Sequence, residues 1–512
     1  MSTCIRISRL ISLPLVSTLA LALGSAACSS GTGTGVGSGG AATAGTGGTS
    51  SSGGASNSGV GGTIGTGGAS SSGGAGPAAG GANTGGGTAS GGSTAAGGDS
   101  AGGSGSGSGG DTGGSTGGGS STGIDGYNDD FQEFAGEDCE LPNPMMLAAG
   151  DHHLPDPFLM SDGTRMSTKD QWKCQRAWLK KTVEAFVHGA KPPKPTTVTG
   201  SIAGKKINVH VEEGGKTADF SVTADTPTAT GPVPAVFQAD GSGVPASFLK
   251  GLGVAAIPYS HSDSEGAFNK LYSGASVSPQ IKWAWAVSRV IDVLVAEKAA
   301  GNNDLIDPSG LGTTGCSYAG KSAFTVGAFD ERIALGMPME SGTGGLASYR
   351  VVNDNDKGPN GGEGPEQLNE ACAKWFGPTF CSNLSKVDSN PADAHFLVAM
   401  YAPRGFTILD NNRIGHLAPV ASYTADAAGA EVFKALGIPN NVGYHGGNDT
   451  DPHNHCSWNK SQEETVTKAV EGFLTKKSPP ANFMEPKLKN ANDQPVDWMS
   501  SKYFTWTTPA LN

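Results

Sequence analysis

Ser317 lies in the segment Gly315-Cys316-Ser317-Tyr318-Ala319-Gly320, whose small residues permit a tight turn between a strand and a helix. Such a turn lifts a serine hydroxyl above the sheet at the start of the helix, where it can attack a carbonyl carbon. The backbone N–H of Tyr318 then points to the place where an oxyanion would form. The usual pattern is Gly-x-Ser-x-Gly, whereas here the second glycine comes one residue later. The segment alone predicts a nucleophile about as well as it predicts an ordinary turn that contains a serine.

A serine nucleophile needs a base and an acid that orients it. After a turn of this kind the order along the chain is serine, acid, histidine. His455 comes at the end of a polar, turn-rich stretch and before an amphipathic helical pattern, which is the position expected for that base. The competing use of the same stretch is a metal site built from Asp449, Asp451, His453 and His455. That spacing matches no defined metal signature, so we predict His455 as the base and no metal.

Two carboxylates are candidates for the acid that orients the base. Asp410 ends an apolar run at 405–410, and the end of a strand at that point is the commonest site for this acid. Glu340 follows an earlier strand and precedes Ser341 and Gly342. Position along the chain favours Asp410, but it leaves both open.

These residues must be positioned by alternating strands and helices. Short apolar runs predict strands at 234–238, 253–258, 311–315, 395–402 and 405–410. Helical spacing of apolar residues predicts helices over 281–298, from 323 to 329, and over 431–436 and 463–474. This alternation predicts a mostly parallel central sheet covered on both faces, the three-layer sandwich of an α/β-hydrolase, within a catalytic domain over 126–512.

The chain before this domain has a different composition. Residues 1–28 resemble an export signal, with Arg6 and Arg9 before an apolar run that is too short to span a bilayer comfortably. Ser25-Ala26-Ala27-Cys28 is a loose lipobox, which predicts lipidation of Cys28, and cleavage near Ala27 by an ordinary signal peptidase is the alternative. Residues 29–125, rich in Gly and Ser, predict a disordered linker because they have too little apolar surface to order the chain. We expect a secreted or surface-tethered protein with no transmembrane span.

The net charge limits the possible binding partners, and the cysteine content indicates disulfide bridges. The formal net charge of −12 argues against nucleic acid as a partner. Export makes disulfides plausible. The cysteines beyond the signal region form an even set and lack paired zinc spacings: Cys139, Cys174, Cys316, Cys372, Cys381 and Cys456. Six cysteines allow fifteen pairings, so spacing leaves the connectivity open.

The catalytic part resembles the glucuronoyl esterases, family 15 of the carbohydrate esterases, over residues 154–511. The matching segments occur in the family's order: 154–158, 190–195, 283–289, 314–317, 320–321, 340–342 and 455–456. The resemblance implies that Glu340 is the acid of a Ser317-His455-Glu340 triad. It also implies a Cys316–Cys456 bridge, as in the fungal members, and a Cys139–Cys174 bridge. The family's third bridge has no partners here, which leaves Cys372–Cys381 as a pair local to this chain.

The resemblance further implies the reaction and its ligands. Family members cleave the ester between 4-O-methyl-glucuronic acid on xylan and a lignin alcohol, with no metal or organic cofactor, and we expect a monomer. Lys321 matches a family lysine that hydrogen-bonds sugar hydroxyls, whereas composition alone would favour a solvated lysine. The family's other sugar ligands should precede Trp375, with Glu363, Gln367 and Glu370 as candidates. We expect His416 where the family has a sugar-stacking tryptophan.

One departure concerns the oxyanion. The family usually has an arginine directly after the nucleophile, and here Tyr318 takes that position, so a neutral phenol stands where a cation would help. Together with His416, this keeps two alternatives open. One is the same serine chemistry on other uronate alkyl esters or acylated sugars, and the other is a surface polysaccharide-binding protein without turnover.

Overall fold

The computed structural model describes residues 133, 139–354, 366–372, 374–446, 454–481, 484, 488–489, 495–496 and 500–512. The expected signal at 1–28, with Cys28, and the expected linker at 29–125 lie outside these residues. So do Glu363 and the stretch containing Asp449, Asp451 and His453. None of the helices in the described ranges is both long and apolar enough to cross a membrane.

A parallel sheet of six strands forms the centre of the described part. Its strands are β4 (Val233–Ala239), β5 (Ala255–Tyr259), β6 (Ile306–Cys316), β7 (Ile333–Met339), β8 (Gly405–Leu409) and β9 (Val442–His445). They lie in the order β5-β4-β6-β7-β8-β9, and every neighbouring pair is parallel. Parallel strands present their carboxyl ends at one edge, so the residues after β6 and β7 become neighbours. The α/β-hydrolase fold expected from the sequence is confirmed.

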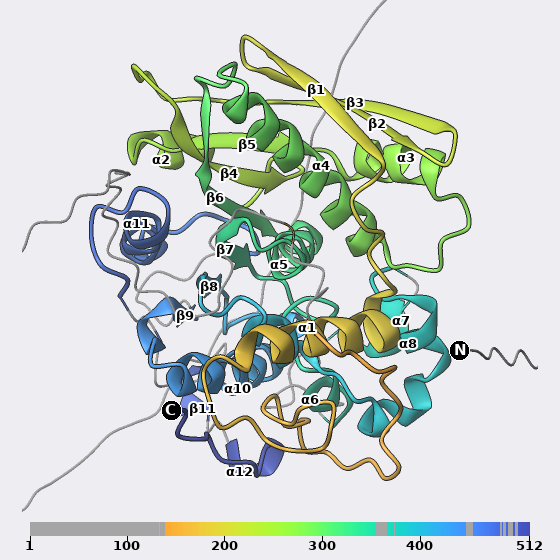
Figure 1. Ribbon diagram of the computed structural model, residues 1–512. Helices are drawn as coiled ribbons and strands as arrows, with labels where there is room; N and C mark the ends of the chain where they lie inside the picture. The colour runs from red at the N-terminus through yellow and green to blue at the C-terminus, as the bar shows by residue number, and fades with distance from the viewer. Residues whose placement is uncertain are drawn as a thin grey trace, which may run out of the picture. The chain divides into compact units, whose positions relative to one another are not determined.

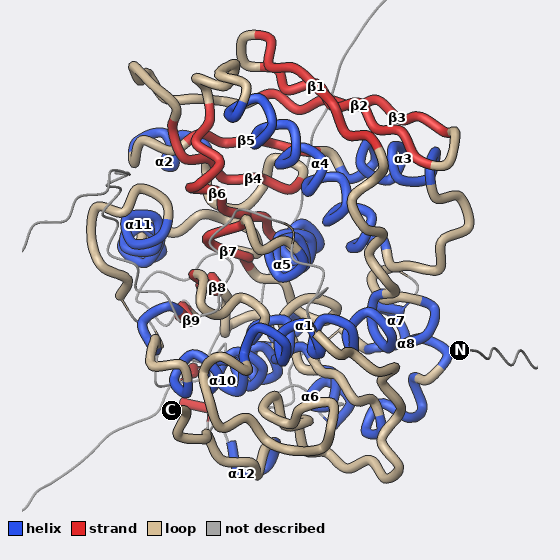
Figure 2. Tube along the Cα trace, in the orientation of Figure 1, coloured by secondary structure: helices blue, strands red, loops and turns tan. Residues whose placement is uncertain are grey.

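Helices cover both faces of this sheet (Figures 1 and 2). One face carries α4 (Pro279–Ala299), α5 (Tyr318–Phe329), α9 (Ala394–Ala399) and α10 (Pro419–Ala435). The opposite face carries α2 (Ala246–Gly251) and α11 (Ser461–Phe473). Alternate residues of a strand face opposite layers. Accordingly, Phe237 of β4 packs in the core beneath α4 and α5, whereas Val236 packs in the core beneath α11.

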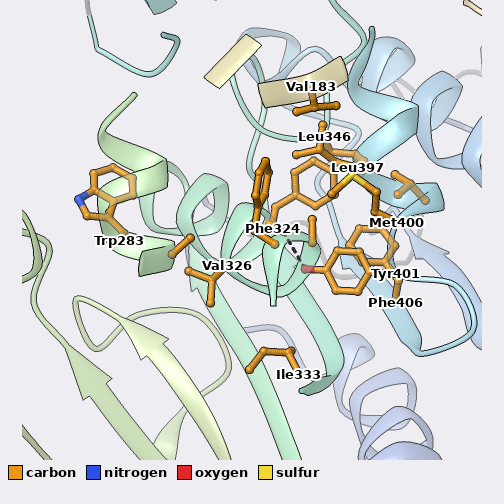
Figure 3. Close-up of a cluster of buried hydrophobic side chains, with 14 of the residues drawn as sticks. Val183, Trp283, Phe324, Val326, Ile333, Leu346, Leu397, Met400, Tyr401 and Phe406 are labelled. Carbon is orange, nitrogen blue, oxygen red and sulfur yellow. Dashed lines mark hydrogen bonds between the residues drawn. The ribbon is translucent and has the colours of Figure 1, made fainter. Parts of the chain in front are cut away.

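Helix α5, which follows the predicted nucleophile, is buried almost all round. Every residue from Ala319 to Phe329 is buried, and the polar Lys321, Ser322 and Thr325 are among them. Figure 3 shows Phe324 of this helix beside Tyr401 and Phe406, with ring centroids 6.3 Å and 5.5 Å away. The Tyr401 hydroxyl also donates a hydrogen bond to the Phe324 carbonyl at 2.8 Å. This packing holds the helix, and therefore the turn before it, rigidly against the sheet.

A separate antiparallel sheet, absent from the sequence-based prediction, packs on α3 (His261–Leu271) and α4. Its strands are β1 (Thr197–Ala203), β2 (Lys206–Glu213) and β3 (Lys216–Thr223). The signal was present in the sequence: Ile207, Val209 and Val211 are buried and alternate with polar residues. Such alternation between turns is typical of half-buried strands.

Three predicted elements are corrected by the structure. The run at 395–402, predicted as a strand, begins within helix α9 because Asp393 caps that helix and accepts a hydrogen bond from the Ala394 amide at 2.7 Å. Short apolar runs do not separate strands from helices, and the N-cap decides here. Helix α5 starts at Tyr318 rather than near Ala323, and the helix predicted at 431–436 is only the end of α10.

The described part contains further elements besides the two sheets and the helices named above. They are α1 (Trp172–Val183), with a π-helical turn over Glu184–His188, α6 (Tyr349–Asp354), α7 (Leu368–Cys372), α8 (Pro378–Ser382), β10 (Leu488–Lys489), β11 (Pro495–Val496) and α12 (Ser500–Tyr503), with 3₁₀ turns at Leu384–Ser389, Gly415–Leu417 and Pro439–Asn441. Two segments that matched the family, 190–195 and 283–289, meet inside the molecule. Buried Lys191 and Arg289 from these segments both pair with Glu133, which ties the start of the described chain to the core.

Candidate active site

The turn around Ser317 has the geometry that a nucleophile elbow requires. Ser317 lies between β6 and α5 with φ 59° and ψ −125°, a conformation that costs about 1–3 kcal/mol for a residue with a side chain. The Ser317 amide donates to the Met339 carbonyl at 3.0 Å, which holds the turn against the end of β7. The backbone is therefore held in this strained form by its neighbours.

Two glycines make this turn possible. A Cβ on Gly315 would lie 2.3 Å from the Ala319 carbonyl oxygen, and one on Gly320 would lie 2.4 Å from the Met339 carbonyl oxygen. Both distances are far below a van der Waals contact, so side chains are excluded there. The second glycine stands one residue later than in the usual pattern because residue 320 is the one that faces the end of β7.

Glu340 and His455 form a direct hydrogen bond. Glu340 follows β7, has φ 47°, and its side chain is fully buried. Its Oε2 atom accepts from His455 Nδ1 at 2.5 Å and from the Cys456 amide at 2.8 Å. With Nδ1 donating to the carboxylate, the other imidazole nitrogen, Nε2, is left as a proton acceptor. The His455 side chain is 41% exposed, so this nitrogen can be reached from solvent.

Asp410, the other candidate acid, is hydrogen-bonded to a tyrosine. It directly follows β8 and is buried, and its Oδ2 atom accepts from the Tyr444 hydroxyl at 2.9 Å. Burial raises the pKa of Asp410 to about 6, and the nearby charge of Glu340 adds to this effect. The acid in hydrogen-bond contact with the histidine is thus Glu340, whereas position along the chain had favoured Asp410.

A disulfide connects the nucleophile loop with the histidine loop. Cys316 precedes Ser317, Cys456 follows His455, and their Cα atoms lie 5.6 Å apart across 140 residues of sequence. Bridges also join Cys139 to Cys174 and Cys372 to Cys381. These are the three pairs expected above, and together they use every cysteine in the described part of the chain.

The same loops bring four potential metal ligands together. Cys316, Glu340, His455 and Cys456 have ligand-type atoms within 4.8 Å of one another. Both sulfurs, however, belong to the disulfide, and a metal is bound by a thiolate. The cluster is therefore explained as the meeting point of the two loops, with the bridge closing them.

Lys321 lies in the first turn of α5, on the side of the site where Glu366 and Trp375 lie. It is 4% exposed, so the alternative of a solvated lysine is wrong. Its Nζ atom donates to the Ser341 carbonyl at 2.6 Å and lies 3.7 Å from Glu366 Oε2. Burial lowers the pKa of Lys321 to about 8, and the carboxylate of Glu366 opposes that shift. Lys321 also lies 5.4 Å from the centre of the Trp375 ring.

Glu366 is the acidic residue that reaches Lys321, and the sequence analysis missed it. Of the candidates named there, Gln367 is half-buried and Glu370 is exposed on α7. Glu366 has a side chain only 13% exposed, and its amide donates to the His416 carbonyl at 3.0 Å. His416 thus supports this cluster through its backbone, while its side chain is exposed. Glu366 directly precedes Gln367, one of the candidates predicted from the sequence.

Tyr318 lies directly beside Ser317 and is 41% exposed. Its backbone N–H is at the first position of α5, where amides have no acceptor within the helix. Its hydroxyl donates to Asp240 Oδ2 at 2.6 Å. The ring lies nearly parallel to Trp375, with 17° between the planes and 6.0 Å between centroids. Tyr318 therefore connects the Lys321 side of the site with the loop after β4.

The model for a family described as "Glucuronyl esterase, fungi" matches residues 209–437. A 4-O-methyl-glucuronoyl methylesterase from Schizophyllum commune is 31% identical over 393 residues, covering 74% of this chain and 96% of the relative.

Solved structures give the same result. The glucuronoyl esterase catalytic domain from Hypocrea jecorina has a TM-score of 0.63 at 31% identity and covers 73% of this chain and 100% of its own. A serine-to-alanine mutant of the glucuronoyl esterase from Sporotrichum thermophile was solved in complex with methyl 4-O-methyl-β-D-glucopyranuronate. It has a TM-score of 0.62 at 31% identity, with the same 73% and 100% coverage.

Proposed function

Because this chain belongs to the glucuronoyl esterase family, we propose that it hydrolyses the ester between 4-O-methyl-glucuronic acid of glucuronoxylan and a lignin alcohol. The observation that carries the proposal is the buried Glu340 carboxylate bonded to His455, whose loop is bridged to the residue before Ser317. The relative that binds methyl 4-O-methyl-β-D-glucopyranuronate supports a uronate ester as the substrate class.

In the proposed mechanism, the Ser317 hydroxyl oxygen attacks the uronate carbonyl carbon while His455 Nε2 accepts its proton. The backbone N–H of Tyr318 stabilises the resulting oxyanion. Glu340 holds the imidazole in the tautomer that can accept a proton and stabilises the imidazolium. Collapse of the tetrahedral intermediate expels the alcohol, which takes the proton from His455. Water then attacks the acyl-enzyme with His455 as base, and the uronic acid leaves.

Lys321 and Glu366 are proposed to recognise the uronate sugar. The lysine is buried beside a carboxylate, so the pair offers one donor group and one acceptor group at fixed positions. Sugar hydroxyls both donate and accept hydrogen bonds, and partners of both kinds suit them. Trp375 beside Lys321 adds an apolar surface of the kind that packs against a sugar ring.

The direct test is hydrolysis of benzyl glucuronate, methyl glucuronate and an acetylated sugar by the wild type and Ser317→Ala. We expect turnover of the benzyl ester and a loss of kcat of about 10⁴-fold or more in the variant. Activity confined to the acetylated sugar would favour the second candidate, serine chemistry on other acylated sugars, for which Tyr318 and His416 are the motivating residues. If the wild type and Ser317→Ala both bind glucuronoxylan and neither turns over any ester, the non-catalytic polysaccharide-binding alternative would be favoured.

Export from the cell is also part of the proposal. Three disulfides suit an oxidising compartment, and residues 1–28 have the pattern of a signal peptide. A lipid on Cys28 followed by the linker at 29–125 would tether the enzyme to the cell surface. Cys28→Ala should then release the protein into the medium, as measured by immunoblot of the cell and medium fractions. An unchanged distribution would argue for ordinary secretion.

A further inference from the structure

The phenol of Tyr318 is committed to a partner outside the triad. Its hydroxyl donates to Asp240 Oδ2 at 2.6 Å, across 78 residues of sequence. A phenol has a single proton to donate, so a hydroxyl bound to a carboxylate in this way has none left for an oxyanion. The cation that the family usually places at this position is therefore not replaced by the hydroxyl of Tyr318.

Asp240 is itself held from the other side. It follows β4 with φ 45°, and its amide donates to the Tyr259 carbonyl at 2.8 Å. Its Oδ1 atom accepts from the His261 amide at 2.9 Å, and its Oδ2 atom lies 2.8 Å from His261 Nδ1. The His261 ring stacks on Trp283 at 3.9 Å between centroids. Asp240 is thus a fixed acceptor rather than a mobile surface carboxylate.

What Tyr318 offers to a bound molecule is therefore its ring. The residue is 41% exposed although its hydroxyl is anchored, and its ring centroid lies 6.0 Å from that of Trp375 and 5.2 Å from that of His261. The polar groups suited to a sugar, Lys321 and Glu366, lie on the Trp375 side. An anchored aromatic face beside Ser317 suits an apolar alcohol better than another sugar hydroxyl.

We propose that Tyr318 determines specificity for the alcohol part of the ester through its ring, and that Asp240 is the positioning residue that holds this ring beside Ser317. The inference rests on the proposed esterase function, in which the alcohol is a lignin alcohol, and adds the residues that recognise it: through the Tyr318 ring, a benzylic ester is preferred to a small alkyl ester. Contact between aromatic rings predicts a preference of about three- to tenfold in KM.

The experiment compares benzyl and methyl glucuronate as substrates for the wild type and for Tyr318→Phe, Tyr318→Ala, Asp240→Ala and Asp240→Asn. Tyr318→Phe keeps the ring but loses the bond to Asp240, so it should raise KM for the benzyl ester about as much as Asp240→Ala does and leave kcat within about threefold on either ester. Tyr318→Ala should raise KM for the benzyl ester about three- to tenfold and leave KM for the methyl ester within twofold. Tyr272→Phe, a phenol packed on Phe268 and Trp285 away from this cluster, is the matched control.

The two Asp240 variants test positioning separately from stability. Asp240→Ala should raise the benzyl KM toward the Tyr318→Ala value with little change in kcat, whereas Asp240→Asn keeps an acceptor oxygen and should restore the preference. Thermal melting identifies any variant that is unfolded. If Asp240→Ala does not fold, Asp240→Asn still tests the positioning role.

Two results would overturn the inference. One is a loss of kcat of about 100-fold on both esters in Tyr318→Phe, which would assign the hydroxyl to the oxyanion. The other is an equal change in KM for both esters in Tyr318→Ala. A wild-type enzyme with no activity on either uronate ester would instead refute the proposed function, and the inference would fall with it.

Discussion

The two sides of the site are built in different ways. On one side, Ser317 and Glu340 follow neighbouring parallel strands, and the loop of His455 is bridged to the first of them. On the other side, Glu366 and Trp375 belong to the stretch between β7 and β8, where short helices alternate with turns. The residues proposed to react are therefore positioned by the central sheet, whereas two of the proposed sugar contacts, Glu366 and Trp375, belong to a connection outside the sheet.

The largest expected effect is a loss of kcat that distinguishes the two buried acids near His455, Glu340 and Asp410. Glu340→Gln should lower kcat by about 10³- to 10⁴-fold, because an amide cannot hold the required tautomer or stabilise the imidazolium. Asp410→Asn is the matched control and should lower kcat by less than tenfold, since Asp410 is bonded to Tyr444. Steady-state kinetics on a uronate ester measures both. Similar losses in the two variants would mean that the acid role is shared.

Removing the disulfide on each side of the site in turn tests whether the two bridges contribute differently to stability. The Cys316–Cys456 bridge spans 140 residues and the Cys372–Cys381 bridge spans 9. Loop-closure entropy predicts a loss of unfolding free energy of about 5 kcal/mol for the first and about 2.5 kcal/mol for the second. Double Cys→Ala variants are compared by urea denaturation.

Kinetics should separate the same two variants. Loss of Cys316–Cys456 should lower kcat, because it releases the loops of Ser317 and His455. Loss of Cys372–Cys381 should mainly raise KM, because that bridge closes the loop containing Trp375. A fall in kcat of equal size in both variants would argue against separate roles for the two sides.

On the recognition side, Lys321→Met should raise KM about 10- to 100-fold and change kcat much less. The reason is that it removes a charged hydrogen-bond donor, worth about 1.5–3 kcal/mol, that is proposed to act on the sugar. Lys434→Met, on the exposed surface of α10, is the control and should leave KM unaltered. A loss confined to kcat would place Lys321 with the reacting groups.

The smallest expected effect is a shift in pH dependence. The pKa of Lys321 is about 8, because burial lowers it while Glu366 opposes the shift. We therefore expect kcat/KM to fall as the pH rises through about 8, where Lys321 loses its proton. Glu366→Gln removes the opposing charge, so the pKa of Lys321 and the alkaline limb should move to lower pH. An alkaline limb at the same pH in the variant would show that another group is responsible.

Much of the fold could be predicted because its signals are local. The strand at 234–238 and the helix at 281–298 appear in the structure as Val233–Ala239 and Pro279–Ala299. The strand predicted at 395–402 was wrong because a run of eight mostly apolar residues suits a strand or a helix, and the cap at Asp393 decided for the helix. The hairpins at β1–β3 were missed although their alternation was visible in the sequence.

The sequence by itself determined the turn around Ser317, because the glycines and the serine that shape it lie within six consecutive residues. Only the tertiary structure decided that His455 bonds Glu340, 115 residues away, and that Glu366 reaches Lys321. It also decided that the phenol of Tyr318 is held by Asp240. These contacts join residues far apart in the chain, and their partners are selected by strand order and by loop packing, which local residue patterns do not encode.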